Sequence, residues 1–374
     1  MVINSIADLR ELARKRVPRA IFDYADRGSY DEITFNRNLD DLHAIQLRQR
    51  VMVDVSKQQL ATNILGEDWT IPLGIGPTGL TGLFHANGEM LGARAAQAFG
   101  VPFCLSTLSI GSIEDVRGAV QKPFWFQVYL MRDRGFNVEL LDRAKVANCS
   151  AIMLTVDMPV QGLRRRDAKN GLSIPPRLTL KNALEVAMKP TWALKVLMGK
   201  RRTFGNLEGR MSEGAGLKTL AERIAQQFDP TVTWKDLAWL RQQWPRKIII
   251  KGILDGVGAV LGGDAIVVSN HGGRQLDGAR STISALPEVV DAVAGRCEVL
   301  FDGGVRTGQD VLKALALGAK GCLMGKAFLY ALAAMGEAGV ALALDIIRKE
   351  LGVSLALTGA NDVRNVTRDI LVRP

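Results

Sequence analysis

A nine-residue segment, residues 269–277, contains the residue types that acid–base chemistry requires, in the order SNHGGRQLD. It follows the short apolar run 265–268, which is typical of a buried β-strand. At the end of such a strand, His271 offers a base that titrates near neutral pH. Arg274 offers a guanidinium that can hold a carboxylate through two hydrogen bonds. The segment therefore indicates a site for an anionic substrate, with a solvent-exposed loop and an incidental histidine as the alternative.

Short apolar segments alternate with helical ones along the chain, and eight of the apolar segments are predicted strands. Eight such strands predict a parallel sheet that closes into a (β/α)8 TIM barrel, an α/β fold. A doubly wound sheet is the alternative, but it would confine the chemistry to one crevice. The predicted strands are 71–75, 102–105, 124–129, 151–156, 247–251, 265–269, 298–302 and 321–324. Predicted helices follow Ser5 and Ser112 as N-caps and cover 19–27, 88–99, 139–147, 286–294 and 309–317.

Polar and ionisable side chains follow the predicted strands, at the end of a barrel where active sites are built. Ordinary turns would favour Asn, Ser and Gly at these points, so we expect the side chains to surround one pocket. In chain order they are Thr78, Ser106, Gln127, Tyr129, Thr155, Asp157, Lys251, Ser269, His271, Asp302 and Lys326. Among them, Asp157 can orient and stabilise a protonated His271. Lys251 ends an apolar strand, so its ammonium should point into the barrel mouth, unless it extends to solvent.

Two glycine-rich turns predict a phosphate site. Residues 302–306 read DGGVR after the seventh strand, and residues 324–326 read MGK after the eighth. Glycine amides with a nearby cation suit a phosphate monoester, and barrels commonly hold one after strands seven and eight. A flavin mononucleotide fits one phosphate better than a dinucleotide. The GxGxxG match at residues 74–79 is a poor NAD motif, because Pro77 interrupts the turn and no acidic residue lies within 93–99.

Composition narrows the class of protein. The 374 residues, 47% of them hydrophobic, suffice for one large domain or two ordinary ones. Four cysteines without CxxC spacing and three histidines argue against a disulfide framework or a metal site, and favour a cytoplasmic setting. The first residues lack the apolar core of a secretory signal, and no run of 18 apolar residues predicts a membrane-spanning helix.

The net charge of +10 is compatible with nucleic acid, anionic lipid or anionic substrates as partners. The location of the basic residues favours anionic lipid. Residues 172–229 form a basic insertion between the fourth and fifth strands, far longer than an ordinary loop. Apolar residues recur there every four positions from Leu180 to Val196, among lysines and with Pro190 breaking or restarting the helix. This is the pattern of an interfacial helix. We expect residues 177–215 to dock on an anionic membrane, with a helix covering the barrel or a flexible lid as the alternatives.

The SNHGGRQLD segment is similar to the signature of the FMN-dependent 2-hydroxy acid dehydrogenases and oxidases. The resemblance extends from FDYADRGSYDE, which contains Tyr24, to LALTGA near residue 360. It implies a single FMN-binding barrel domain over residues 1–374, with the insertion as a lid or membrane-docking segment. It also implies oxidation of an (S)-2-hydroxy acid to a 2-oxo acid with reduction of FMN.

The resemblance implies roles for individual residues. His271 would be the base and Asp157 its partner, while Lys251 would stabilise the negative charge that develops on the reduced flavin. The residues implied to contact the substrate are Tyr24, Tyr129, Arg164 and Arg274, with a solvated basic run as the alternative for Arg164. The residues implied to bind FMN are Pro77, Thr78, Gly79, Ser106, Gln127, Thr155, Lys251, Ser269, Asp302, Gly303, Gly304, Arg306, Gly325 and Lys326.

Within the family, the segments RDRGF, VDMP, FDPTVTWKDL, KGILD and LDGARST are most similar to bacterial respiratory L-lactate dehydrogenases, followed by mandelate dehydrogenases. This implies oxidation of L-lactate to pyruvate, a quinone-type acceptor, a homotetramer, and a peripheral position on the cytoplasmic face of the inner membrane. The alternatives are an (S)-mandelate dehydrogenase and a soluble oxidase that makes hydrogen peroxide. Gly79 favours a dehydrogenase over the oxidase, because many oxidases carry Ala at this position. A basic barrel that binds nucleic acid or acts as a scaffold would leave His271, Arg274 and Lys251 unexplained.

Two positions depart from the family pattern. Lys326 stands where Arg is usual, so we expect weaker retention of FMN than an Arg fork would give. Residues 252–264 provide only 13 residues between the fifth and sixth strands, and Gly256, Gly258, Gly262 and Gly263 are among them. Because glycine disfavours a helix by about 1 kcal/mol relative to Ala, we expect a short, frayed helix there.

Overall fold

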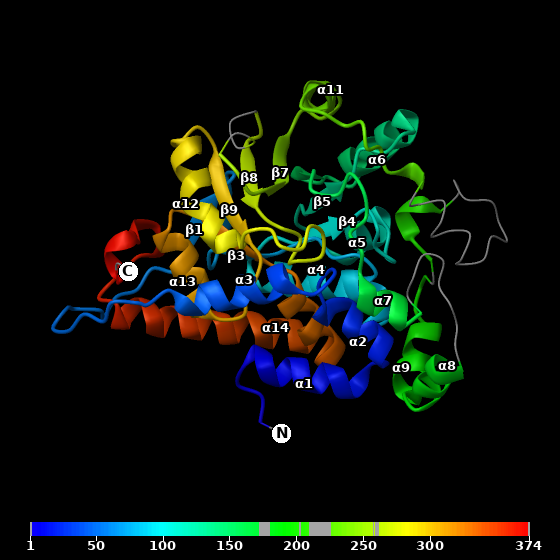
Figure 1. The fold of residues 1–374 in the computed structure, drawn as a ribbon, viewed down its shortest axis with the longest axis horizontal. Coiled ribbons are helices and arrows are strands. Elements are labelled where there is room, and N and C mark those ends of the chain that lie inside the picture. Colours follow the sequence, from blue (N-terminus) through cyan, green and yellow to red (C-terminus); the bar gives the residue numbers. More distant parts are fainter. Residues whose placement is uncertain are drawn as a thin grey trace.

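The computed structural model describes residues 2–171, 180–201, 203–208, 226–256, 258 and 262–372. An eight-stranded parallel sheet forms its centre, in the order β3-β10-β9-β8-β7-β6-β5-β4 (Figure 1). A hydrogen bond of 2.9 Å from the amide of Ile75 to the carbonyl of Pro102 joins the first strand to the last. The predicted (β/α)8 barrel is confirmed. Its strands are β3 (Leu73–Ile75), β4 (Cys104–Ser106), β5 (Trp125–Val128), β6 (Ala151–Thr155), β7 (Lys247–Ile253), β8 (Ala265–Val268), β9 (Glu298–Asp302) and β10 (Gly321–Met324).

The strands are buried on both faces, which is why their sequences are continuously apolar. One cluster of side chains fills the barrel interior and a larger one lies between the strands and the helices. A short hairpin, β1 (Thr62–Ile64) and β2 (Glu67–Trp69), adds Ile64 and Trp69 to the interior cluster. The ring of Trp69 lies 5.6 Å from that of Trp125. This hairpin was not predicted from the sequence.

Helices surround the sheet. The barrel helices are α4 (Gly88–Phe99), α5 (Ile113–Ala119), α6 (Arg134–Val146), α11 (Lys235–Gln243), α12 (Thr282–Val293), α13 (Gly308–Ala316) and α14 (Lys326–Leu357). The predicted start at residue 139 was wrong, because Asp133 accepts a hydrogen bond from the amide of Phe136 and starts α6 earlier. The start at 286 was wrong for the same reason, since Ser281 caps α12. The predicted caps Ser5 and Ser112 both form capping boxes.

Three N-terminal helices precede the barrel: α1 (Ile6–Arg16), α2 (Arg19–Asp26) and α3 (Ile33–Ala44). The predicted inner face of α1 is confirmed, since Ile6, Leu9 and Ala13 are buried. Figure 1 shows α1 and α2 beside α14, and α3 near the barrel mouth. The sequence did not predict α3. Short 3₁₀ turns, η1 (Thr81–Leu83), η4 (Val363–Asn365) and η5 (Arg368–Ile370), connect or end elements.

The described part of the insertion contains α8 (Leu180–Ala187), α9 (Pro190–Leu197) and the 3₁₀ turn η2 (Gly205–Leu207), after the short helix α7 (Arg165–Lys169). Pro190 is the first residue of α9, so the four-residue pattern is divided into two helices, as predicted. The indole of Trp192 donates to the carbonyl of Leu83 at 2.8 Å and fixes α9 on the barrel. The predicted frayed helix falls largely on residues 257 and 259–261, which lie outside the described residues.

One described helix, α14, is long and apolar enough to cross a membrane by length and composition alone. The sequence expectation, which counted only uninterrupted apolar runs, did not identify it. Its most apolar stretch is 72% buried in the protein, and Gly336 interrupts it with a non-helical backbone (φ 65°). Its apolar side chains pack against α1, α4 and α13, which accounts for its composition.

The contact between α13 and α14 depends on Gly308. A Cβ there would lie 2.0 Å from the backbone nitrogen of Leu351, so Gly308→Ala must force the helices apart. We expect it to destabilise the protein by about 2–3 kcal/mol in urea unfolding. Gly118→Ala in α5 is the matched control, because its Cβ would meet nothing within 4 Å. This substitution should leave the stability unchanged or raise it. Equal stability of the two variants would contradict this packing.

Candidate functional site

The carboxyl ends of the strands surround a pocket of about 840 Å³, part of it open to solvent. Most of the residues singled out in the sequence line it: Tyr24, Pro77, Thr78, Gly79, Arg164, Lys251, His271, Arg274, Asp302, Gly303, Gly304, Arg306, Gly325 and Lys326. The others lie at strand ends around it without lining it: Ser106, Gln127, Tyr129, Thr155, Asp157 and Ser269. Three further lining residues, Ala25, Gly272 and Val305, lie within segments that the sequence analysis singled out, whereas Phe35, Asn38, Leu39, Leu323 and Leu329 were not indicated as site residues.

His271 and Asp157 form a pair at the side of this pocket. The Nδ1 atom of His271 lies 3.1 Å from Oδ1 of Asp157. His271, Gly272 and Gly273 all have positive φ, at 58°, 65° and 71°, so the chain turns sharply where β8 ends. The amide of His271 donates to Oγ of Ser269 at 3.1 Å and fixes this turn.

The pKa values define the charges of this pair. Burial lowers the pKa of His271, and Asp157 opposes that shift only in part. Burial raises the pKa of Asp157, but His271 and Lys251 outweigh it, and the net shift is downward. A carboxylate only accepts hydrogen bonds, so the neutral imidazole must donate from Nδ1. Its Nε2 then carries a lone pair that can accept a proton.

Lys251 is a buried cation at the end of β7. Its ammonium donates to Oγ of Ser269 at 2.9 Å and lies 3.2 Å from Oδ2 of Asp302. Ser269 donates in turn to Asp302 at 3.0 Å. Burial lowers the pKa of Lys251, but Asp302 and Asp157 raise it more, so the ammonium stays charged. The site therefore holds a fixed positive charge that water does not screen.

Two guanidiniums also line the pocket. Arg274 donates to the carbonyls of Tyr24 and Arg27 and stacks over the ring of Tyr24 at 4.5 Å. Its buried Nη2 lacks a hydrogen-bond partner among the described residues and lies 3.7 Å from Asp167. Burial, and then the charge of Arg274, lower the pKa of Arg164 to about 10. A bound carboxylate would relieve this repulsion.

Tyr129 adds a neutral phenol to this region. It is buried and packs edge-to-face on Phe228 with ring centroids 5.1 Å apart. Burial raises the pKa of Tyr129. The charge of Asp157 raises it further, while the charges of Arg164 and Arg274 lower it. The phenol therefore keeps its proton at neutral pH and can donate a hydrogen bond to an anion.

Gln127 presents an unpaired donor at the end of β5. Its Oε1 accepts hydrogen bonds from Oγ of Ser106 at 3.1 Å and from the amide of Thr107 at 3.2 Å. Its Nε2 is buried and has no partner among the described residues. Because buried donors are nearly always satisfied, this amide indicates an acceptor on a bound group. Thr155, at the end of β6, lies opposite Lys251 in the sheet register.

The turns after β9 and β10 have the features of an anion site. Gly303 and Gly304 have φ of 111° and 99°, and a Cβ on Gly304 would lie 2.6 Å from the carbonyl of Asn38. Burial, then Arg274 and Arg306, lower the pKa of Lys326 well below its usual value. Its ammonium lies 5.0 Å from the ring centroid of Phe35. Glycine amides and cations that repel one another match the needs of a phosphate.

Comparisons with known proteins agree with this chemistry. Residues 13–373 match the family described as FMN-dependent dehydrogenase. The chain is 48% identical over 376 residues to an L-lactate dehydrogenase of Caulobacter vibrioides (strain NA1000 / CB15N), covering 99% of this chain and 98% of that protein. It is 46% identical over 378 residues to an L-lactate dehydrogenase of Ectopseudomonas mendocina (strain ymp), covering 100% of both.

Two solved structures are similar over nearly the whole chain. A crystal structure of the monotopic membrane protein (S)-mandelate dehydrogenase has a TM-score of 0.94 and 36% identity, with 100% of both chains covered. A mandelate oxidase has a TM-score of 0.84 and 36% identity, with 99% of this chain and 98% of that chain covered.

The substitution Asp157→Asn tests how the carboxylate affects the pKa of His271. Asp157→Asn removes the main interaction that holds the pKa of His271 up, so that pKa should fall further below its usual value. Because the folded pKa already lies below the unfolded one, charging His271 costs stability as the pH falls below about 6.5. An NMR titration of the three histidines measures this, with His43 and His85 as unchanged internal controls. A higher or unaltered pKa in the variant would refute the arrangement.

Proposed function

Because the chain belongs to the family of FMN-dependent dehydrogenases, we propose that it oxidises L-lactate to pyruvate, with a quinone-type acceptor for the electrons. The observation that carries this is the 48% identity to an L-lactate dehydrogenase along the whole chain. The pocket supports it, since a base, a buried ammonium and two guanidiniums lie around one cavity. An (S)-2-hydroxy acid offers a carboxylate for the guanidiniums and a hydroxyl for the base.

The pocket residues fit FMN. Bound FMN supplies the two-electron acceptor of the reaction. At the ring end we assign it to Pro77, Thr78, Gly79, Ser106, Gln127, Thr155, Lys251 and Ser269. The unpaired Nε2 of Gln127 and the buried charge of Lys251 support this assignment. At the phosphate end we assign it to Asp302, Gly303, Gly304, Arg306, Gly325 and Lys326. The weaker grip of Lys326, relative to an Arg fork, stays a prediction.

The substrate side of the pocket has a division of roles. Arg164 and Arg274 hold the carboxylate, because their mutual repulsion is relieved by an anion. Tyr24 and Tyr129 donate hydrogen bonds from their phenols. The alcohol loses two hydrogens, and the Nε2 of His271 takes one of them as a proton. Asp157 then stabilises the resulting imidazolium through Nδ1.

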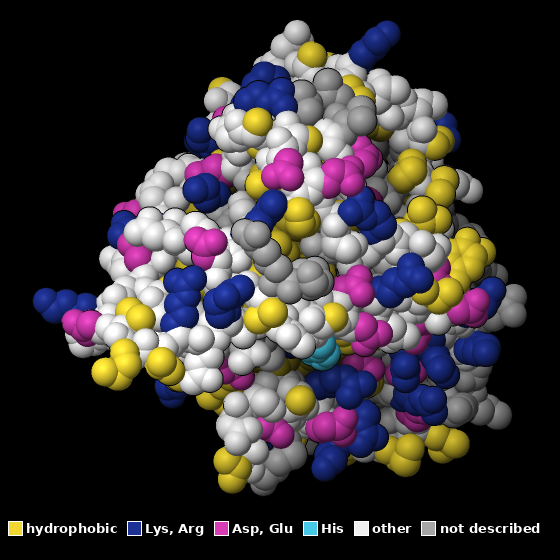
Figure 2. Space-filling view, turned by 60° about the vertical axis from the view of Figure 1, so that its left-hand side comes forward, with side chains coloured by type: hydrophobic (Ala, Val, Ile, Leu, Met, Phe, Trp, Pro, Cys, Tyr) yellow, Lys and Arg dark blue, Asp and Glu magenta, His cyan; other side chains and the backbone are white. Residues whose placement is uncertain are grey.

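The competing functions find less support. An (S)-mandelate dehydrogenase is favoured by the TM-score of 0.94, but sequence identity falls from 48% for the lactate enzyme to 36% for that structure. A soluble oxidase is supported by the similarity to a mandelate oxidase at a TM-score of 0.84. A nucleic-acid binder needs a continuous basic surface. On the face shown in Figure 2, Lys and Arg are interspersed with acidic and apolar side chains.

The substrate is tested by mixing the yellow protein with L-lactate, (S)-mandelate, glycolate and D-lactate without oxygen. We expect L-lactate to bleach the flavin with a second-order rate constant at least about tenfold above that of (S)-mandelate, the discrimination that one pocket contact provides. D-lactate should leave the flavin yellow. Preference for mandelate would replace the proposed substrate, and stoichiometric peroxide under air would replace the proposed acceptor.

His271→Asn is the matched control for this experiment. It should retain FMN, because His271 is assigned to the substrate side, but bleach roughly 10²–10⁴-fold more slowly for lack of the base. Unchanged bleaching in this variant would remove His271 from the mechanism.

We propose that the insertion, residues 172–229 of a single domain, docks the protein on the cytoplasmic face of the inner membrane. The apolar side chains that α8, α9 and their flanks expose include Leu184 (65%), Met188 (69%), Leu194 (60%) and Met198 (75%). Lys189, Lys195 and Lys200 lie in the same segment. Apolar side chains beside lysines suit an anionic lipid surface, and a similar structure is described as a monotopic membrane protein. A homotetramer stays a prediction of the sequence resemblance.

Membrane docking is tested by sedimentation with vesicles of anionic lipid. The chain should pellet with the vesicles, and salt should weaken the binding. Replacing Leu184 and Leu194 by Asp should lower binding at least about tenfold, because each side chain contributes about 1.5 kcal/mol or more when buried. Val146→Asp on α6 is the control, since Val146 is 88% exposed and lies outside the insertion. This variant should bind the vesicles like the parent protein. A protein that stays soluble with and without residues 177–215 would rule out docking.

A further inference from the structure

Asn206 is a fully buried asparagine at the returning end of the insertion. It lies in η2 and has no exposed surface, although the sequence around it shows no apolar pattern. Its backbone carbonyl accepts a hydrogen bond of 3.0 Å from Arg143 of α6. A buried amide side chain is costly unless its hydrogen bonds are made, so its partners define what this position does.

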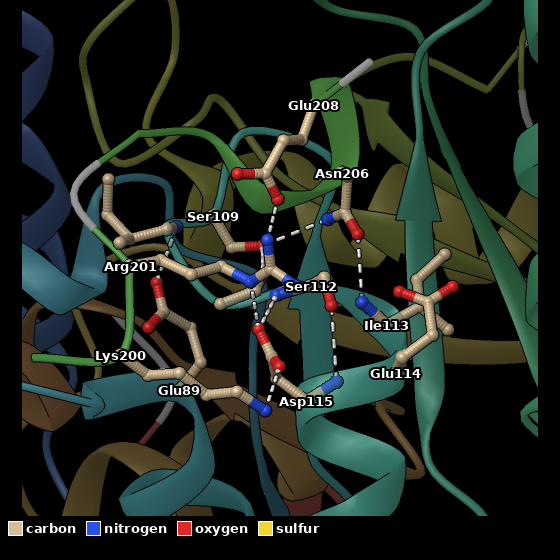
Figure 3. A network of polar contacts seen from close by, with 12 residues as sticks. Glu89, Ser109, Ser112, Ile113, Glu114, Asp115, Lys200, Arg201, Asn206 and Glu208 are labelled. Atoms are coloured by element: carbon tan, nitrogen blue, oxygen red, sulfur yellow. Dashed lines mark hydrogen bonds and ion pairs between the residues drawn. The ribbon is translucent and has the colours of Figure 1, made fainter.

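The side chain of Asn206 is bonded almost entirely to the loop after β4. Its Nδ2 donates to the carbonyl of Ser106 at 3.2 Å, to Oγ of Ser109 at 3.1 Å and, at 3.4 Å, to the carbonyl of Thr107. Its Oδ1 accepts from the amide of Ile113 at 2.9 Å. Figure 3 shows Asn206 facing Ser109 and Ile113. One side chain of the insertion thus fixes both ends of this loop.

The same loop orients Gln127. Oγ of Ser106 and the amide of Thr107 both donate to Oε1 of Gln127, and Oγ1 of Thr107 donates to its backbone carbonyl at 2.6 Å. With its oxygen held in this way, the amide presents its unpaired Nε2 on the other side. The loop also carries Leu108, whose carbonyl accepts from the amide of Leu80 at 2.9 Å beside the pocket residue Gly79.

Ion pairs outside that loop also hold Asn206 in place. Lys200 and Arg201 both pair with Asp115 at the start of α5, and Arg201 also pairs with Glu208 (Figure 3). These ion pairs lower the pKa of Asp115 to about 2 against the opposing effect of burial, so they persist at neutral pH. The amide of Lys200 also donates to Oδ1 of Asn87 at 3.0 Å. Two residues before Asn206 are therefore tied to the barrel helices, and Glu208 after it is tied to one of them.

We propose that Asn206 is a positioning residue for the flavin site. It fixes the backbone of Ser106 and Thr107, and through them it holds the amide of Gln127 with its donor toward FMN. Without Asn206, two buried carbonyls lose a donor, the loop relaxes, and the Gln127 amide is free to turn. The inference rests on the assignment of Gln127 to FMN made above, and it does not depend on which acid is oxidised.

The test measures release of FMN from the full-length holoenzyme, by the fluorescence of free flavin after dilution, without substrate. We expect Asn206→Ala to release FMN about tenfold faster, and Gln127→Ala to release it faster as well. In the double variant, Asn206→Ala should add nothing to the effect of Gln127→Ala, because Asn206 acts on FMN through Gln127. If the two effects multiply instead, Asn206 is only structural and the inference falls.

Two further variants keep the test decisive if Asn206→Ala folds poorly. Asn206→Asp preserves the acceptor for Ile113 but sets an oxygen against the carbonyls of Ser106 and Thr107, so it should also speed FMN release. Gly118→Ala in α5, whose Cβ would meet nothing within 4 Å, touches neither the loop nor Asn206 and should release FMN at the parent rate. Parent-like release from Asn206→Asp would overturn the inference. If Gln127→Ala alone changes nothing, the assignment of Gln127 fails and the inference fails with it.

Discussion

An excess of buried positive charge at the barrel mouth is the constraint on which the site depends. Lys251 is balanced by Asp302 and Asp157 and stays charged. Arg164 and Lys326 are less well balanced, since burial and neighbouring cations lower the pKa of Arg164 to about 10 and that of Lys326 well below its usual value. Such a pocket is relieved by anions at two places. The proposed phosphate of FMN and carboxylate of the substrate are those anions, and the charge distribution supports both assignments together.

The backbone makes this concentration of charge possible. Three successive residues with positive φ, His271 to Gly273, turn the chain after β8, and two more glycines follow β9. A Cβ at Gly273 would lie 2.5 Å from the backbone of Phe35, so α3 packs directly on the turn. Helices outside the barrel alternation thus complete the pocket, because α2 contributes Tyr24 and α3 contributes Phe35 and Asn38.

The insertion belongs to this site as well as to the proposed membrane surface. Its exposed side holds Leu184 and Leu194, while Trp192 and Asn206 bond to the loops after β3 and β4. The segment that we propose to meet lipid is therefore fastened to the loops that flank the cofactor pocket. A hydrogen bond transmits position only while both partners are fixed, and the ion pairs at Asp115 fix this one.

The sequence by itself determined the barrel, its eight strands, the N-caps Ser5 and Ser112 and the pocket lining that follows the strands, because apolar periodicity and local caps are properties of neighbouring residues. It also placed His271 beside Asp157, since all strands of a barrel end at one face. Only the tertiary structure decided the hairpin below the barrel, the place of α3, the pairing of Arg274 with Asp167 and the burial of Asn206. These depend on contacts between residues far apart in the chain, such as Asn206 and Ser106, which leave no periodic pattern around either residue.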